Sequence, residues 1–500
     1  MKKALFALMA TTAITLSVPS ISAETPMPAQ GIDSGLLDKM LGNMPAGTKN
    51  AISVFRDGKA IKVTIDIQQI AQGLAQSGFS IASKPWTFVL TPQADGTLRE
   101  TTEAPVDFSI NYDLQGVVGE SGSYTYLGCT VDGVFDPKIS FFRDASIRID
   151  KTTGDMRNPK ASSSVTLQVG PQTNHVTSVP DGDGRLNVHV TQLTKAITEK
   201  VHVDPAQANP AVHGPVVDMD LLIKDIAGDI NVTGLKSVAA TKLGVFVAAN
   251  KDSINIKSKQ DEFKSLVHDV VPILDKLDLS GQVHSFTVQT PFGQGGAGSM
   301  GVSMSADTHN IDETITLGET LDGLTIDSVF VPTWSRQLIP TSMDLEFGMG
   351  GIDISGGLNK LVDALSRHDF ASPEPDKTDY AALGRAAFIP DSIVHLRLKP
   401  SHITGPIYTI KWQGQVDSNI NGKDAKVHVD VSATGIDDVI KTLATVHDKG
   451  VPETMIGLYA AKALAKPGPD GSLLWAIDVD TATGMLVNGK PVGPRGGKPL

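Results

Sequence analysis

Three glycines, Gly293, Gly295 and Gly298, have the spacing of a dinucleotide-binding loop. In such a loop the absence of side chains lets the backbone approach a pyrophosphate, and a helix must follow at once to present its N-terminal amides. Here the residues before and after the loop alternate between apolar and polar, as at Val302 and Met304, which indicates strands on both sides. The sequence therefore predicts a glycine-rich hairpin tip instead of a nucleotide site.

Two other segments come close to the Gly-x-Ser-x-Gly elbow of serine hydrolases. Residues 297–301 read Ala-Gly-Ser-Met-Gly and residues 119–123 read Gly-Glu-Ser-Gly-Ser. The elbow needs a strand before the serine and a helix after it, so that the hydroxyl is exposed on a sharp turn. Neither segment is followed by a helical pattern. No serine nucleophile is predicted from these motifs.

The chain has 12 histidines and one cysteine, side chains that can serve as metal ligands. No His-Glu-x-x-His motif occurs, no two histidines are four residues apart, and a single cysteine excludes a thiolate cluster. Asp478 begins a stretch like a calcium loop, but Thr483 stands where the loop needs glycine and Gly489 where it needs glutamate. Histidines gathered from distant strands remain an alternative to histidines on polar strand faces. We predict no catalytic residue, no metal site and no cofactor.

Composition limits the classes of function. The 500 residues include 43 Lys and Arg against 55 Asp and Glu, giving a net charge of −12, and 40% are hydrophobic. An acidic chain with no basic stripe is a poor ligand for nucleic acid, so no nucleic-acid partner is expected. Only 5% of residues are aromatic, which weakens the case for a carbohydrate site. The lone Cys129 is predicted to be a small buried residue.

The N-terminus has the layout of a secretory signal peptide. Lys2 and Lys3 precede an apolar stretch at 4–18, and small residues follow up to Ala23. We expect cleavage after Ala23 and a periplasmic location. No later segment reaches the ~20 apolar residues of a membrane-spanning helix, so no transmembrane segment is expected in the mature chain.

The mature chain is expected to have two regions. The Pro- and Ala-rich stretch 204–215 is the best linker candidate, because its prolines discourage both helix and central strand. It separates an N-terminal β-rich region at 24–205 from a C-terminal α+β region at 216–500. One continuous elongated domain is the alternative.

Alternation with a period of two is the main structural signal. It predicts half-buried strands with one face on a core and one in water, as in antiparallel sheets. Dipeptides such as Asp57-Gly58 and Asn421-Gly422 provide hairpin turns between them. The clearest strands are those around Val63–Ile67, Met343–Phe347, Val394–Leu398 and Val427–Val431. The predicted fold class is α+β, with large, mainly antiparallel sheets and several packed amphipathic helices.

Helical spacing of apolar residues appears in fewer places. The predicted helices are Asp261–Leu279 with a kink at Pro272, a hairpin of 436–443 and 455–464, and the shorter Leu36–Leu41, Ile67–Leu74, Leu193–Lys200 and Leu358–Leu365. A strand that runs into a short helix recurs at 61–75, 186–197, 343–365 and 427–443. In the C-terminal hairpin, the stripes of Ile440 and Tyr459 are expected to cover one sheet face, with Trp475 buried beneath them.

The C-terminal segment resembles a known group of proteins. A helix ending at Ala463-Leu464, a loop with Asp470-Gly471, the strand 473–478 and the ending Gly484–Pro491 follow one another. This order is similar to that of the YdgA-like group, which are exported Gram-negative envelope proteins of similar length and unknown function. The resemblance implies an envelope location. It supplies no catalytic residues.

These observations favour a non-enzymatic periplasmic protein. Long antiparallel sheets with an apolar side can shelter a lipid or another hydrophobic ligand, or contact an envelope protein. A plainer alternative is a protein whose sheets bury each other completely. The alternative from another class is a hydrolase of envelope polymers, with Ser, His and carboxylates brought together from separate strands.

Overall fold

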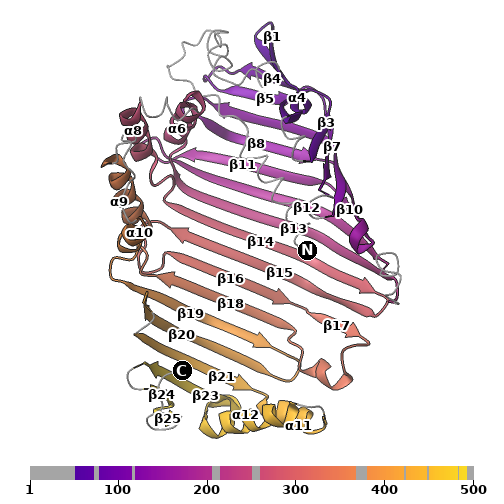
Figure 1. Cartoon of the computed structure of the whole chain (residues 1–500), viewed down its shortest axis with the longest axis vertical. Coiled ribbons are helices and arrows are strands. Elements are labelled where there is room, and N and C mark those ends of the chain that lie inside the picture. The colour runs from indigo at the N-terminus through magenta and orange to yellow at the C-terminus, as the bar shows by residue number, and fades with distance from the viewer. Residues whose placement is uncertain are drawn as a thin grey trace. The chain divides into compact units, whose positions relative to one another are not determined.

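The computed structural model describes residues 51–72, 78–114, 119–204, 214–250, 259–367, 380–421, 424–447, 450–481 and 484–492. The predicted signal peptide, the helix predicted at 36–41 and most of the predicted linker lie outside these residues. Within them, antiparallel strands predominate, as the sequence predicts (Figure 1). No helix in the described part of the chain is long and apolar enough to cross a membrane.

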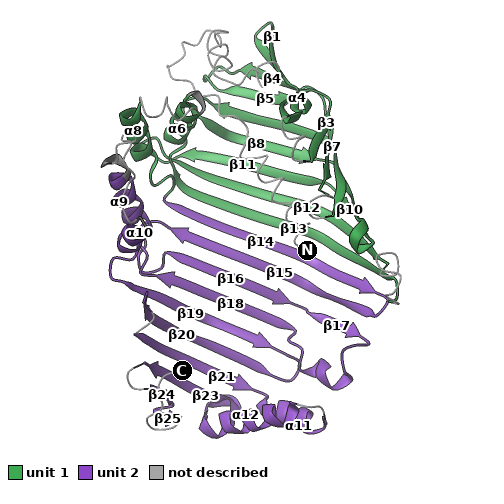
Figure 2. Cartoon of the chain, in the orientation of Figure 1, with its two compact units in different colours: residues 1–274, 366–374 green, residues 275–365, 375–500 purple. Residues whose placement is uncertain are grey.

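The chain divides into two compact units, which are described separately (Figure 2). The N-terminal unit comprises residues 1–274 and 366–374, and the C-terminal unit comprises residues 275–365 and 375–500. The predicted boundary at 204–215 falls inside the first unit, in a stretch of which residues 205–213 are not described. That domain division stays a prediction.

The N-terminal unit is a sheet of long strands with three helices among its described residues. Its strands are β1 (Ile52–Asp57), β2 (Ala60–Ile65), β3 (Phe79–Ser83), β4 (Trp86–Pro92), β5 (Leu98–Thr102), β6 (Val106–Asp113), β7 (Ser121–Asp136), β8 (Phe141–Ile149), β9 (Lys151–Asn158), β10 (Ser163–Val169), β11 (Gln172–Pro180), β12 (Leu186–Val203) and β13 (Val217–Leu235). Its helices are α4 (Ile67–Ile70), α6 (Ser237–Ala249) and α8 (Gln260–Val270), with a 3-10 turn at Pro159–Ala161.

A crease crosses these long strands near their middle. The first half of β7 pairs with β9, and its second half, beyond the crease, pairs with β8. In the same way, the first half of β12 pairs with β11 and its second half pairs with β10. The register is the same on both sides, so β8 with β9, and β10 with β11, are single strands that bend. The bends fall at Gly128 (φ 68), Asp150, Gly170 and Ala196 (φ 52), which are neighbours across the ladders. We call this line the crease of the N-terminal unit.

The alternation of buried and exposed side chains shifts by one residue at the crease. On β12 the buried residues Val188 and Thr194 have even numbers, whereas Ile197 beyond the crease is odd, and Lys195 and Ala196 between them are exposed. In an extended strand each residue turns the next side chain to the opposite face of the sheet. A residue in the left-handed region does not do so, and the alternation of buried and exposed positions is therefore shifted by one residue beyond it. The buried side of the sheet therefore continues across the bend.

The N-terminal unit has a closed core. Trp86, Phe108 and Tyr126 pack with Cys129 and Ile149, and the Trp86 and Phe108 ring centroids are 5.6 Å apart. A second cluster comprises Ile61, Leu90, Leu98 and Phe135. Cys129 is 3% exposed, which confirms its prediction as a small buried residue. Burial also raises the pKa of its thiol to about 12.

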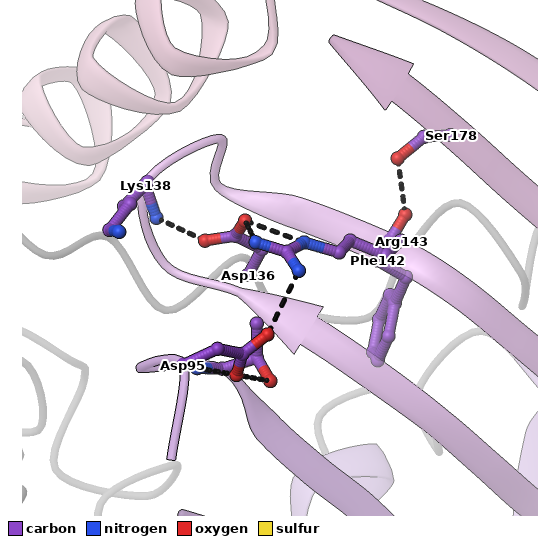
Figure 3. A network of polar contacts seen from close by, with 7 residues as sticks. Asp95, Asp136, Lys138, Phe142, Arg143 and Ser178 are labelled. Carbon is purple, nitrogen blue, oxygen red and sulfur yellow. Dashed lines mark hydrogen bonds and ion pairs between the residues drawn. The ribbon is translucent and has the colours of Figure 1, made fainter. Parts of the chain in front are cut away.

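An ion-pair network holds two turns of this unit together (Figure 3). The Arg143 guanidinium lies 2.7 Å from the Asp136 carboxylate and 3.0 Å from that of Asp95. Asp136 is 3% exposed and also accepts a bond from the Lys138 backbone N–H at 2.9 Å. Arg143 Nε and Nη2 both donate to Asp136 Oδ2, and the Lys138 N–H donates to Oδ1, so both oxygens of this buried carboxylate are satisfied. The network is therefore a structural connection between the β4–β5 and β7–β8 turns.

The C-terminal unit is an antiparallel meander. Its strands are β14 (Lys276–Thr290), β15 (Gly293–Asp307), β16 (Ile315–Asp322), β17 (Thr325–Ser328), β18 (Ser342–Gly350), β19 (Ile393–Thr404), β20 (Thr409–Asn419), β21 (Ala425–Thr434), β22 (Lys466–Pro467), β23 (Leu473–Asp480), β24 (Gly484–Val487) and β25 (Lys490–Val492). Successive long strands pair in the order β14, β15, β16, β18, β19, β20, β21, β23 and β24. This unit also has a crease, at Ser285 (φ 50), Gly298 and Gly323 (φ 66), beyond which β17 continues β16 along β15.

The helices of this unit lie at the ends and the margin of its sheet (Figure 1). They are α9 (Ile354–Arg367), α10 (Tyr380–Phe388), α11 (Ile436–Ala444) and α12 (Val451–Leu464), with 3-10 turns at Thr333–Gln337 and Pro469–Gly471. The predicted C-terminal helical hairpin is confirmed. Ile440 of α11 is 6% exposed, but Ile456 and Tyr459 of α12 are 69% and 53% exposed. The prediction that both stripes are covered is therefore wrong for α12.

Trp475 connects α12 to the sheet. It lies on β23 opposite Val431, and its indole N–H donates to the Ala461 carbonyl at 2.7 Å. Its side chain is half-buried. The expected full burial of Trp475 is therefore not observed.

Three predicted helices differ from the structure. Leu193–Lys200, and with it the predicted strand-to-helix unit at 186–197, belongs to strand β12. The predicted Asp261–Leu279 helix ends at Val270, before Pro272, and its last residues begin β14. α4 covers Ile67–Ile70 of the predicted helix 67–74, of which residues 73 and 74 lie outside the described part of the chain. Helix 358–365 is confirmed within α9.

Candidate functional site

The sheet of the C-terminal unit has one apolar and one polar face. Residues directly opposite each other on antiparallel strands point to the same face, so the ladders assign each side chain. Phe347 lies opposite Leu398, and Val427 opposite both Val416 and Val479. We call the resulting set the apolar face: Leu277, Leu279, Val283, Met300, Val302, Met304, Ala306, Ile315, Leu317, Leu321, Met343, Leu345, Phe347, Met349, Val394, Leu396, Leu398, Ile403, Ile410, Trp412, Val416, Ala425, Val427, Val429, Val431, Ala433, Leu473, Trp475, Ile477, Val479, Met485 and Val487.

Described residues leave most of the apolar face partly open to solvent. Of its members only Ala433 and Val487 are buried, whereas Val302, Leu317 and Met485 are 62%, 45% and 39% exposed and the others are half-buried. At roughly 4.8 Å per strand, the face from β14 to β24 is about 40 Å long. Contiguous apolar surface of this extent is rare unless something binds to it. The single carboxylate on it is Glu319, between Val302 and Leu345.

The opposite face is polar and carries cross-strand His–Asp pairs. His395 Nδ1 lies 2.7 Å from Asp417 Oδ1, and His428 Nδ1 lies 2.7 Å from Asp478 Oδ1. The N-terminal unit has the same device at His202 and Asp218. All six side chains are at least 37% exposed. Histidines on polar strand faces, as the sequence predicts, fit this arrangement.

A shallow cleft of about 260 Å³ opens on the polar face around His428, with Asp417, Lys426 and Asp480 among its walls. The Asp478 hydrogen bond raises the pKa of His428, and Asp430, 3.5 Å from Nε2, adds to the effect. No group of three or more metal-ligating side chains occurs among the described residues. The cleft is thus a charged surface depression.

We expect His428 to titrate above its ordinary pKa of 6.5 and Asp478→Asn to lower that pKa. The bonded carboxylate stabilises the imidazolium, so its contribution to stability is present below pH ~6.5 and is lost as pH rises through the folded-state pKa. NMR titration of the imidazole C–H signals measures both values. Asp430→Asn is the comparison, with a smaller expected decrease because Asp430 is farther away. An equal effect of the two substitutions would contradict the assignment.

A Ser–His–Asp arrangement occurs on the surface of the N-terminal unit. Ser146 Oγ is 2.9 Å from His175 Nδ1, and His175 Nε2 is 3.4 Å from Asp144 Oδ2. All three side chains are exposed. Acyl transfer also needs donors for the oxyanion, but β8 is hydrogen-bonded to β7 on one edge and to β11 on the other. The backbone of β8 around these residues is therefore engaged on both edges and offers no free donors for an oxyanion.

The glycines that suggested a nucleotide loop lie on β15, beginning at the turn after β14. Gly293 pairs with Ser328, and Gly295 with Ile326 on β17. A strand follows instead of a helix, so the predicted hairpin is confirmed. Ser299, from the elbow-like segment, lies in the same strand.

The apolar face was not assigned as a site from the sequence. Its residues show the alternation that predicts half-buried strands. The sequence pattern does not show that the described residues leave this face uncovered. A second feature missed is Glu100 on β5, opposite Leu90 and Gly133. Burial raises the pKa of its carboxyl to about 7.

Comparisons with family models, with curated proteins and with solved structures gave no match to this chain.

Proposed function

We propose that this protein binds hydrophobic ligands, specifically acyl chains, along the apolar face of the C-terminal unit. The observation that carries the proposal is the long row of half-buried and exposed aliphatic side chains from β14 to β24. Covering such side chains gains about 25 cal/mol per Å² of apolar surface. Acyl chains supply that cover without requiring hydrogen-bond partners.

The dimensions support this ligand class. The hydrocarbon core of a bilayer is about 30 Å thick, so one acyl chain extends about 15 Å. The apolar face, about 40 Å across its strands, is long enough for more than one such chain. We also infer that amphipathic helices close parts of this unit, since Val362 of α9 and Ile440 and Leu443 of α11 are buried.

The proposal includes an exported, periplasmic protein without enzymatic activity. Its support is the signal-peptide pattern up to Ala23 and the resemblance of the C-terminal segment to YdgA-like envelope proteins. An envelope protein seated on the same face is the other occupant that the sequence suggested. The experiment below separates the two.

Leu317→Asp is expected to lower the uptake of a fluorescent fatty acid at least tenfold. Leu317 lies between Met304 and Phe347 on the apolar face, and a carboxylate there would lose its water when an acyl chain covers it. Because Leu317 is 45% exposed, its replacement should leave the thermal unfolding curve nearly unchanged. Fluorescence titration of the mature chain measures uptake, and native mass spectrometry detects lipid that copurifies.

Thr316→Asp is the matched control, since it adds the same charge to the same strand on the opposite face. We expect it to retain wild-type uptake. If wild-type protein takes up no fatty acid and carries no copurified lipid, the proposal is wrong. Equal uptake by the two variants would place the ligand elsewhere.

A further inference from the structure

A tight turn follows β17 directly, and it has two large apolar residues at its central positions. The Val331 N–H donates to the Ser328 carbonyl at 3.1 Å, which places Val329 and Phe330 at the two central positions. Such positions usually hold Gly, Pro, Asn, Asp or Ser. Here the two side chains are 78% and 73% exposed, the largest values among the exposed large hydrophobic residues described.

The turn is held in this protruding form by its neighbours. The Val329 N–H donates to the Phe292 carbonyl at 3.0 Å, and the Ser328 hydroxyl donates to the same oxygen at 3.2 Å. The Phe292 and Phe330 ring centroids are 5.3 Å apart. These contacts hold the turn with Val329 and Phe330 against the β14–β15 turn. The exposure of the two apolar side chains therefore needs an explanation.

The charges around the turn are compatible with a lipid surface. Residues 328–335 include no charged side chain, and Trp334 is among them. The nearest acidic residue before them, Asp327, is paired with Arg336 at 2.8 Å, so it presents no uncompensated charge. Aromatic side chains such as Phe and Trp suit the boundary between headgroups and acyl chains.

We propose that Val329 and Phe330 insert into the surface of a lipid bilayer. A convex corner of two side chains would need a matching pocket in a protein partner, whereas acyl chains rearrange around any small apolar protrusion. The inference rests on the proposed function, because it supplies the source of the acyl chains. Further apolar residues lie on neighbouring strands of the same unit. Ile326 of β17 lies opposite Gly295 of β15, which in turn lies opposite Val288 of β14.

Cosedimentation with vesicles of phosphatidylcholine and phosphatidylglycerol tests this proposal. Transfer of a Val or Phe side chain out of water changes a partition constant by about tenfold or more. Val329→Asp and Phe330→Asp are each expected to lower vesicle binding at least tenfold. Val179→Asp is the matched control, because Val179 is 62% exposed at the end of β11, and we expect it to bind vesicles like wild type.

A second measurement compares Phe330→Trp with wild type, which already has four tryptophans. Vesicles containing brominated acyl chains should quench a larger share of the fluorescence of the variant. Absence of vesicle binding in wild type, or equal binding by all variants, overturns the proposal. So does a Phe330→Asp variant that loses uptake of a soluble fatty acid in the absence of vesicles, since the turn would then belong to the apolar face.

Failure of the proposed function gives a different result, namely no fatty-acid uptake by wild type while the variants still differ in vesicle binding. Binding of the turn to a protein instead of lipid would leave vesicle binding unchanged by both substitutions.

Discussion

Replacing Gly435 by alanine is expected to destabilise the C-terminal unit by at least about 3 kcal/mol, because two penalties add. Gly435 has a φ of 76°, and a side chain in the left-handed region costs roughly 1–2 kcal/mol. Its added Cβ would also overlap the Ile407 carbonyl oxygen and approach Tyr408 Cα at 2.9 Å. Both are backbone atoms, so relief requires the turn between β19 and β20 or the junction between β21 and α11 to move.

Gly450→Ala separates the two penalties. Gly450 begins α12 with a φ of 93°, and nothing lies within 4 Å of the position where its Cβ would be. Only the conformational penalty of roughly 1–2 kcal/mol is expected there. Denaturant unfolding followed by tryptophan fluorescence measures both variants, and one of the four tryptophans, Trp475, bonds to α12. Equal losses would show that the Ile407 contact is absent.

Glu100→Gln is expected to stabilise the protein by about 2 kcal/mol at pH 8 and to have little effect at pH 4. Burial raises the pKa of Glu100 from 4.5 to about 7, so the folded state favours the protonated carboxyl. Wild-type stability should therefore fall as pH rises from about 4.5 to 7, where ionisation is penalised in the folded state alone. Glutamine is neutral throughout and avoids this loss. Unfolding curves at several pH values measure the difference.

Glu103→Gln is the control for Glu100→Gln. Glu103 follows the same strand, but its carboxylate forms an ion pair with Lys62 at 2.7 Å and is 46% exposed. Removing its charge should give no gain at pH 8. A gain for Glu100→Gln that is independent of pH would contradict the raised pKa.

Strands with a single buried face could be predicted from local sequence. Alternation at Met343–Phe347, Val394–Leu398 and Val427–Val431 identifies β18, β19 and β21. The helical hairpin of α11 and α12 could also be predicted, because Gly450 and Pro452 mark the break. In these segments local pattern and tertiary packing require the same conformation.

The crease explains why a strand resembled a helix in the sequence. Across the bend of β12 the buried positions step from Thr194 to Ile197, which is a spacing of three. Together with Leu193 and Ile197, which are four apart, this step imitates the i, i+3, i+4 pattern of an amphipathic helix. Only the pairing of β12 with both β10 and β11 distinguishes the two, and that information is not local.

Other features could not be predicted because they depend on what is absent or distant. Helix α6 consists mostly of small and apolar residues without a polar stripe, so no helical period appears in Ser237–Ala249. The apolar face was predicted as one side of half-buried strands. Whether another layer covers such a side depends on the rest of the chain, and alternation in one strand carries no information about it.

The meander of the C-terminal unit allows the length of its apolar face to change by whole strands. Each long strand from β18 to β21 is hydrogen-bonded to the strand before it and the strand after it in the sequence. Inserting or deleting a whole hairpin between two of them would therefore leave every other register intact. One hairpin adds two strands, or about 10 Å of surface. Homologues that differ by one hairpin are expected to accept ligands that differ in length by that amount.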